Sequence, residues 1–222
     1  MKRIVVFVLA CIFCLPIAAC NRESSIPDLP VSIVTAKASS IKAVAVEWKF
    51  GEKFNGEKFD WGPVPKKDLK AQRNFFNQPA PGLWIEKWVG AQPEIEGKFV
   101  LVDFWATWCP RCQRAVPELN EIAKQFQDEL VVVGITDETE EKLRAFKIPV
   151  KYFSAIDSEE RTKSAIGIWT RPHILLIDPA GTVCWQGFAF EPGSELTAQV
   201  IQERIQQFQD RQLTNGVSSL SN

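Results

Sequence analysis

The spacing of hydrophobic residues changes several times along the chain, and each spacing indicates a type of element. Over 44–50, large apolar residues alternate with alanine, glutamate and lysine, which is typical of a half-buried strand. Short continuous apolar runs between turn residues are typical of strands that are buried on both faces. Runs of this kind predict strands from residue 100 onward and at 130–135. Other stretches rich in apolar residues predict a short strand or turn at 84–89 and strands at 150–155, 174–177 and 182–188.

Helical spacing dominates the stretches between these runs. After residue 112, apolar residues recur at intervals of three and four and mark one face of a helix, in which Pro117 is expected to cause a kink. Further helices are predicted at 138–146, 157–166 and 194–208. Strands that alternate with helices, and then a hairpin and a closing helix, predict an α/β sandwich with a mixed sheet.

The first twenty residues have the pattern of an export signal. Two basic residues precede an apolar stretch, 4–17, that is too short to cross a hydrocarbon core comfortably as a helix. The stretch ends in Ile17-Ala18-Ala19-Cys20, which resembles the lipobox of bacterial lipoproteins. We expect 1–20 to be a lipoprotein signal peptide and Cys20 to carry lipid that holds the protein on a membrane. Ordinary cleavage nearby and an uncleaved anchor are the alternatives.

Two segments of different character follow the signal. Residues 21–40 contain prolines and serines without a helical period, and we interpret them as a linker. Residues 41–78 are expected to form an N-terminal extension with a hairpin, which turns at Asn55-Gly56, and a short helix from Pro65 to Asn77. This extension either covers the domain or binds a partner, and covering is the favoured interpretation.

Length and composition favour one globular domain with extensions. The chain has 222 residues, of which 45% are hydrophobic and 11% aromatic, enough for a sizeable core. We expect this domain at 79–210 and a polar, flexible tail at 211–222. A net charge of -1, with lysines and arginines scattered along the chain, argues against a nucleic-acid partner.

Two cysteines, Cys109 and Cys112, stand where the strand from residue 100 ends and helical spacing begins. Cysteines three positions apart lie on one face of a helix, and the free N–H groups and dipole at a helix start favour a thiolate. We therefore interpret the pair as a redox-active dithiol. A zinc site would need two more ligands, with only Cys184 and His173 available outside Asp and Glu, and an isolated structural disulfide is the other alternative. Cys184, in an apolar strand, is expected to be a buried, inert thiol.

The residues around the dithiol resemble a known family. The stretch Asp103-Phe104-Trp105-Ala106-Thr107-Trp108-Cys109-Pro110-Arg111-Cys112 is similar to the active site of the thioredoxin superfamily, and its last eight residues resemble the membrane-tethered TlpA/ResA type. The similarity runs from about residue 79 to about residue 208 and includes Pro117, Pro172 and the turn at 178–181. It implies a thioredoxin-like three-layer sandwich with a mixed sheet, to which this chain adds an N-terminal β-containing extension.

The resemblance implies a role for three residues in disulfide exchange. Cys109 would be the nucleophile, Cys112 the resolving thiol, and Asp103 the buried acid that relays a proton to and from that thiol. Apolar neighbours are expected to raise the pKa of Asp103 towards neutrality, the alternative being a solvated aspartate at the strand end. Thioredoxins place a lysine near this acid, whereas residues 131–136 contain none. The pKa of Asp103 is therefore expected to be set in a different way.

The resemblance also implies a client-binding loop. Pro172 matches the superfamily's cis-proline, which brings its loop beside the cysteines and offers backbone hydrogen bonds to an extended substrate. Arg171 either faces Cys109 and stabilises the thiolate or contacts the rim of the site. His173 either faces Cys109 in the same way or, as the favoured alternative, faces solvent at the start of its strand.

Other residues in and near the motif complete the expected binding surface. Arg111, between the cysteines, adds a positive charge that favours the thiolate. Trp108, with Trp105 and Trp169, is expected to form an apolar rim for extended or unfolded clients, although Trp105 is also placed as a core residue would be.

Together these observations predict an extracytoplasmic thiol-disulfide oxidoreductase, anchored by lipid on the periplasmic side of a membrane in the cell envelope. It would act on protein clients with its own dithiol and without a further cofactor or metal, most simply as a reductant. The resemblance implies cytochrome c maturation or metal-site assembly as the client pathway and a membrane thiol-disulfide donor as the source of electrons. The alternative is a copper-binding assembly factor using Cys109, Cys112 and His173, although the cysteines of Sco-type copper chaperones are spaced more widely.

Overall fold

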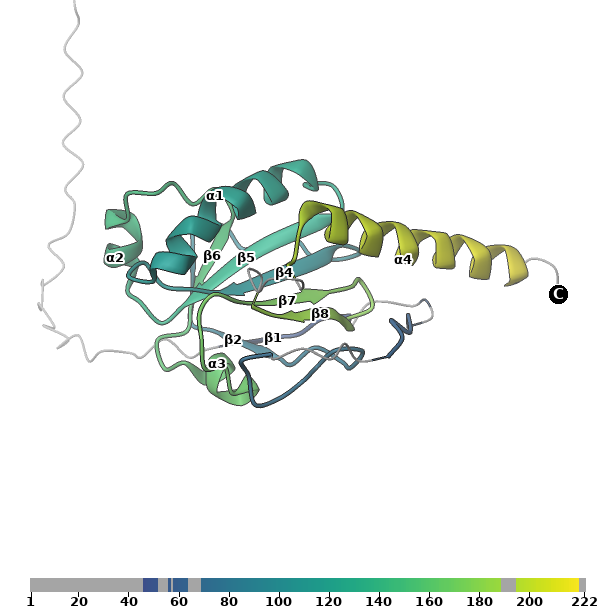
Figure 1. Ribbon diagram of the computed structural model, residues 1–222, viewed down its shortest axis with the longest axis horizontal. Helices are drawn as coiled ribbons and strands as arrows, with labels where there is room; N and C mark the ends of the chain where they lie inside the picture. Colours follow the sequence, from purple (N-terminus) through teal and green to yellow (C-terminus); the bar gives the residue numbers. More distant parts are fainter. Residues whose placement is uncertain (1–45, 52–55, 57, 64–68, 189–194, 220–222) are drawn as a thin grey trace, which may run out of the picture. The chain divides into compact units, whose positions relative to one another are not determined.

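A computed structural model describes residues 46–51, 56, 58–63, 69–188 and 195–219 (Figure 1). The predicted signal peptide, the lipidation site Cys20, the linker and the turn at Asn55-Gly56 lie wholly or partly outside these residues. Among the helices within the described ranges, none is both long enough and apolar enough to span a membrane.

A six-stranded mixed sheet forms the centre of the fold. Its strands lie in the order β3-β6-β5-β4-β7-β8. β4 pairs in parallel with β5, and β5 with β6, whereas β3, β7 and β8 are antiparallel to their neighbours. The strands are β3 (Lys87–Val89), β4 (Phe99–Phe104), β5 (Leu130–Thr136), β6 (Phe153–Ile156), β7 (His173–Ile177) and β8 (Val183–Gly187).

Helices cover both faces of this sheet and make three layers (Figure 1). α1 (Pro110–Gln125) and α4 (Ala198–Ser219) lie on one face, while α3 (Arg161–Ile166) lies on the other; α2 (Glu140–Ala145) follows β5. Because side chains alternate along a strand, β4 contributes Phe99 and Leu101 to the core under α1 and α4, and its other apolar residues to the core under α3. The predicted three-layer sandwich with a mixed sheet is confirmed.

The N-terminal extension packs on the domain. β1 (Val46–Trp48) pairs with β2 (Leu83–Ile85) in a separate two-stranded sheet. Farther along, isolated bridges join Phe76 to Val183 and Pro79 to Thr182, beside the edge strand β8. These contacts support the interpretation of the extension as a cover.

The short helix predicted from Pro65 to Asn77 is wrong over the part that the structure describes. Residues 69–77 form turns and isolated bridges instead. Their backbone N–H groups bond to the domain: Asn77 N donates to Val183 O and Gln72 N to Gly167 O, each at 2.8 Å. Tertiary hydrogen bonds therefore replace the local ones that a helix would need.

The last part of α4 also differs from the prediction, because it is more regular than expected. The segment expected to be a flexible tail continues α4 as far as Ser219. Phe208 is the last residue of α4 in the hydrophobic core, so burial does not hold the following turns. Local hydrogen bonds, such as Gln206 Nε2 to Asp210 Oδ1 at 2.8 Å and Thr214 Oγ1 to Asp210 O at 2.9 Å, are made there instead.

Candidate active site

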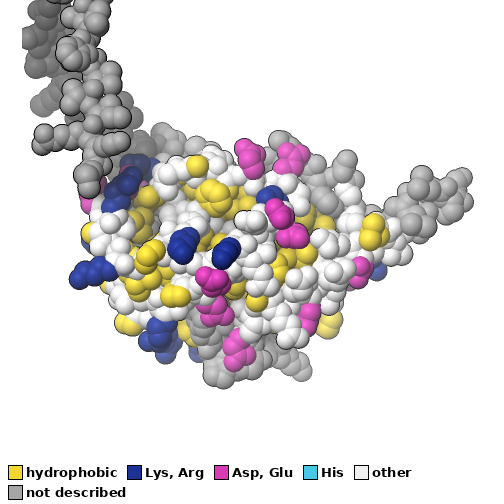
Figure 2. All heavy atoms as spheres, turned by 90° about the horizontal axis from the view of Figure 1, so that it is seen from above, with side chains coloured by type: hydrophobic (Ala, Val, Ile, Leu, Met, Phe, Trp, Pro, Cys, Tyr) yellow, Lys and Arg dark blue, Asp and Glu magenta, His cyan; other side chains and the backbone are white. Residues whose placement is uncertain are grey.

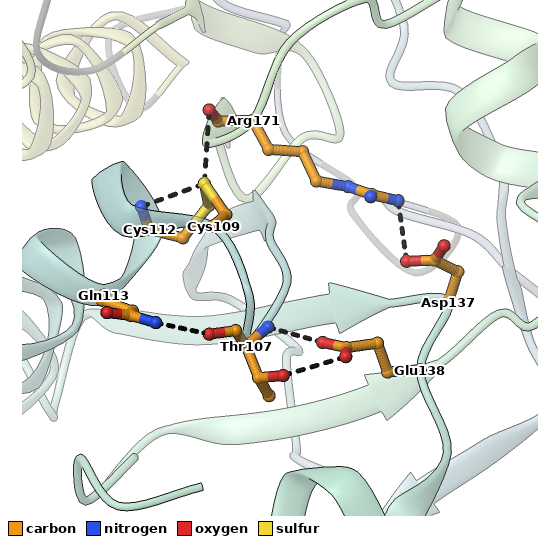
Figure 3. The surroundings of a disulfide bond; sticks show 7 residues. All are labelled: Thr107, Cys109, Cys112, Gln113, Asp137, Glu138 and Arg171. Atoms are coloured by element: carbon orange, nitrogen blue, oxygen red, sulfur yellow. Dashed lines mark hydrogen bonds and ion pairs between the residues drawn. A yellow bond between two sulfur atoms is a disulfide. The ribbon is translucent and has the colours of Figure 1, made fainter.

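Cys109 and Cys112 form a disulfide at the junction of strand and helix, as the sequence predicts (Figure 3). Cys109 is the N-cap of α1, and its sulfur accepts a hydrogen bond from Cys112 N at 3.2 Å. Pro110 occupies the first turn, where its missing N–H removes a donor that would have no partner in the helix. Cys109 retains 6% exposure while Cys112 has none, so Cys109 is the sulfur of the pair that is accessible from outside.

The loop before β7 lies beside the reactive sulfur. The Arg171–Pro172 bond is cis, and the carbonyl oxygen of Arg171 is 3.6 Å from Cys109 Sγ. The backbone preceding Pro172 is therefore next to Cys109, where the resemblance places a client-binding loop.

The Arg171 side chain does not face the disulfide, so of the two alternatives the rim contact is the one observed. Its guanidinium pairs with Asp137 at 2.8 Å and with Glu160 at 2.6 Å, and it points away from the sulfur atoms (Figure 3). It also lies 5.7 Å from the centroid of the Trp108 ring. Two carboxylates attract the guanidinium more strongly than an apolar disulfide does, so Arg171 contacts the rim.

His173 faces neither solvent nor the cysteines, contrary to both expectations. It is fully buried in β7, opposite Phe104, and its Nε2 lies 3.4 Å from Gln186 Nε2. Ile174, the next residue, belongs to the core that contains Cys112, so alternation puts His173 on the opposite face of the sheet. The three proposed copper ligands are therefore not brought together, and the described residues include no cluster of three potential metal ligands.

Asp103 is buried near the end of β4, the strand that leads to the dithiol. Its side chain is 1% exposed and has no hydrogen-bond partner among the described residues. Burial raises its pKa from 3.8 to about 8, which excludes the alternative of a solvated aspartate. Its neighbour on β5 is Gly134, so no lysine approaches it from that position. Desolvation alone thus brings Asp103 into the range where it can exchange a proton near neutral pH.

Glu138 is a site residue that sequence reasoning missed. It is buried after β5, and its carboxylate accepts hydrogen bonds from Thr107 N and, at 2.9 Å, from Thr107 Oγ1. Gln113 Nε2 donates to Thr107 O at 2.7 Å, so the loop before Cys109 is held from both sides (Figure 3). The available signal was an acidic residue just beyond a parallel strand, where functional groups gather in α/β sheets.

The tryptophans divide between core and surface. Trp105 is fully buried, so of its two expected places it takes the one in the core and not the one in the rim. Trp108 and Trp169 are 63% and 68% exposed. Arg111 lies with its guanidinium 5.3 Å from the centroid of the Phe188 ring. The surface near Cys109 therefore offers aromatic rings and a cation, but from fewer residues than predicted.

Cys184 is a buried thiol, as predicted. It has no exposed surface, and its sulfur lies 3.4 Å from Leu176 O. Burial raises the pKa of this thiol well above its ordinary value, and the charge of Asp178 acts in the same direction. Because exchange requires a thiolate, Cys184 has no place in the reaction.

Comparisons with known proteins find relatives of the region that contains the dithiol. The AhpC/TSA family profile matches residues 88–186. The thioredoxin-like protein YneN of Bacillus subtilis is 25% identical over 126 residues, which cover 53% of this chain and 72% of YneN. The thiol-disulfide oxidoreductase ResA of Geobacillus thermodenitrificans is 31% identical over 94 residues, which cover 40% of this chain and 54% of ResA. The chain therefore spans about half the length of this ResA.

Solved structures show the same fold. A solution structure of a candidate protein disulfide isomerase from Bacteroides thetaiotaomicron has a TM-score of 0.51 and 20% identity, covering 70% of this chain and all of that one. The fold is thioredoxin-like, and the chain carries a dithiol where β4 leads into α1. Over the matched residues the chain is similar to proteins named ResA and YneN, in agreement with the resemblance expected from residues 103–112.

Proposed function

We propose that this protein exchanges disulfides with protein clients outside the cytoplasm, with Cys109 as nucleophile and Cys112 as resolving thiol. The observation that carries the proposal is the arrangement of three groups. The slightly exposed Cys109 sulfur caps α1, and the carbonyl oxygen of Arg171 lies 3.6 Å from it. The carboxyl of Asp103 is buried near the end of β4, the strand that leads to Cys109. A purely structural disulfide needs neither the loop backbone nor the buried carboxyl.

In the reducing direction, the Cys109 thiolate attacks one sulfur of the client disulfide. A bond forms between Cys109 and that sulfur, and the other client sulfur leaves as a thiolate that takes a proton from water. Cys112 then gives its proton to the Asp103 carboxylate and attacks Cys109 Sγ, which releases the second client sulfur as a thiolate that is also protonated. The client gains two electrons and two protons, and the protein is left with the Cys109–Cys112 disulfide.

Client binding in this proposal uses backbone and aromatic contacts. The chain before Pro172 offers hydrogen bonds to an extended segment next to Cys109, while Trp108 and Trp169 offer exposed rings. On the face drawn in Figure 2, acidic, basic and apolar side chains are interspersed. Such a surface suits clients chosen by shape and backbone contacts rather than by strong charge.

We further propose that the protein acts as a reductant and is recharged by a membrane thiol-disulfide donor. The apolar stretch at 4–17 and the sequence ending in Cys20 support export and lipid anchoring, which would keep the site near such a donor. Cytochrome c maturation and metal-site assembly are the client pathways that the TlpA/ResA resemblance favours. The proposed reductant role requires a potential nearer that of thioredoxin, about -270 mV, than that of DsbA, about -120 mV.

The test is a Cys112→Ser variant of the full chain expressed in its own cell envelope. Without the resolving thiol, mixed disulfides between Cys109 and clients should accumulate and disappear on reduction. A Cys184→Ser variant is the matched control, because it removes a buried thiol and should trap nothing. Absence of adducts that depend on Cys109 would refute the exchange function, and a potential close to that of DsbA would refute the reductant role.

A further inference from the structure

Three polar groups are buried near the active site without a hydrogen-bond partner among the described residues. They are the Asp103 carboxyl, the indole Nε1 of Trp105 and the hydroxyl of Tyr152. All three residues are at most 7% exposed. Buried polar groups are nearly always satisfied by protein or by ordered water, so this cluster needs an explanation.

Gly134 brings these groups together. It pairs with Asp103 across β4 and β5. A Cβ placed on Gly134 would lie 2.6 Å from Trp105 Nε1 and 2.9 Å from Tyr152 Cε2, so both rings occupy the space that a side chain would fill. Burial, and then the charge of Asp103, raise the pKa of Tyr152 well above its ordinary value, which agrees with the closeness of the two residues.

A cavity adjoins this cluster. Its volume is about 190 Å³, and both Trp105 and Tyr152 line it. Several water molecules fit in such a space, since each takes about 30 Å³ in the liquid. Leu143, Phe146 and Ile148 in its wall are partly exposed, so the cavity leads from the buried cluster towards solvent.

We infer that Tyr152 and Trp105 form, with water in this cavity, the hydrogen-bonded route by which Asp103 exchanges its proton with solvent. The inference rests on the proposed function, in which Asp103 receives one proton from Cys112 in each reducing turnover. That proton must leave before the carboxylate can act again, and Asp103 itself is only 1% exposed. Tyr152 acts through Asp103 and not on the client, so it is a positioning residue.

The hydroxyl group of Tyr152 distinguishes this residue from a ring that only fills space in the core. A ring that served packing alone could be phenylalanine, which would leave no polar atom to bury. A hydroxyl that donates to the carboxylate, directly or through water, stabilises its charged form. Removing the hydroxyl should therefore make Asp103 harder to ionise, whereas removing an apolar part of the same cavity wall should not.

The first test uses the fact that Tyr152 is the single tyrosine of the chain. Labelling tyrosine with carbon-13 at Cζ gives one NMR signal from the full-length protein. Its chemical shift should change with a midpoint near pH 8, following Asp103, and the change should be absent in Asp103→Asn. A signal that does not respond to Asp103 would overturn the inference.

The second test measures the two steps of exchange separately. Reduced protein treated with Ellman's reagent releases one thiolate when Cys109 attacks and a second when Cys112 resolves the mixed disulfide. Tyr152→Phe should leave the first phase unchanged, slow the second about fivefold at pH 7 and move its pH midpoint upward, as expected for one lost hydrogen bond. Phe146→Leu, which alters the same cavity without removing a polar atom, is the matched control.

The outcomes separate the two proposals. If wild-type protein releases both thiolates but Tyr152→Phe has the wild-type midpoint and rate in the second phase, the proton route is wrong and the exchange function stands. An equal effect of Phe146→Leu would also overturn the route, because packing would then explain the loss. If the wild-type protein shows no second phase at all, the proposed exchange function fails first.

Discussion

Replacing Asp103 by asparagine tests the central electrostatic feature of the site. The carboxyl has 1% exposure and its pKa is raised from 3.8 to about 8 by burial. In the folded protein it stays neutral up to about pH 8, whereas in the unfolded chain it ionises above its ordinary pKa. Between these pH values the unfolded state binds fewer protons than the folded state, so a rise in pH favours unfolding.

The magnitude follows from the separation of the two pKa values. Each pH unit between them lowers the free energy of unfolding by about 1.4 kcal/mol, and the loss levels off above the folded-state pKa. At pH 7 the accumulated cost is on the order of 4 kcal/mol. An asparagine side chain cannot ionise but has nearly the same shape, so Asp103→Asn should be more stable than the wild type by a margin that grows with pH.

The assay is urea denaturation of the oxidised protein at several pH values between about 5 and 9, a range that spans the folded-state pKa. The stability difference between Asp103→Asn and the wild type should widen by about 2.7 kcal/mol from pH 5 to pH 7 and stay constant above about pH 8. Asp128→Asn, a change on the surface, is the matched control. Its free energy of unfolding should change with pH in parallel with that of the wild type. Parallel curves for Asp103→Asn as well would refute the assignment of Asp103 as a buried, neutral acid.

Three other changes test the surroundings of the site. Gly134→Ala places a methyl group 2.6 Å from Trp105 Nε1, so rings must shift and the free energy of unfolding should fall by about 1–3 kcal/mol in urea denaturation. Glu138→Gln turns one acceptor towards a donor of Thr107, and the lost charge-assisted bond should lower the free energy of unfolding by about 2 kcal/mol in the same assay. Brief alkylation of the folded, reduced protein followed by peptide mapping should leave Cys184 unmodified until denaturant is added.

Each of these predictions has a result that contradicts it. Wild-type stability of Gly134→Ala would mean that the ring cluster beside Asp103 is loosely packed. Equal stability losses in Glu138→Gln and in the exposed control Glu141→Gln would mean that the bonds to Thr107 contribute nothing specific. Rapid alkylation of Cys184 in the folded protein would show that β8 opens on the time scale of the reaction.

Local sequence patterns were sufficient to predict most of the helices and strands and the position of the dithiol. Continuous apolar runs located β4, β5, β7 and β8, and the change to helical spacing after Cys112 located α1. The predicted helix from Pro65 and the predicted frayed end after Phe208 failed for opposite reasons. The first segment bonds to the domain instead of to itself, and the second stays helical and makes local hydrogen bonds after contact with the core has ended.

The sequence by itself predicted an α/β sandwich and the reactive pair, because these depend on residue type and on spacing along the chain, while the role of Asp103 came from the resemblance to the thioredoxin superfamily. Tertiary structure alone decided what surrounds them. In the fold, His173 lies on the face of the sheet opposite Cys112, and the Arg171 guanidinium pairs with Asp137 and Glu160. The rings of Trp105 and Tyr152 pack against Gly134. These contacts join residues far apart in the chain, and which face of a strand meets which neighbour is set only when the sheet packs.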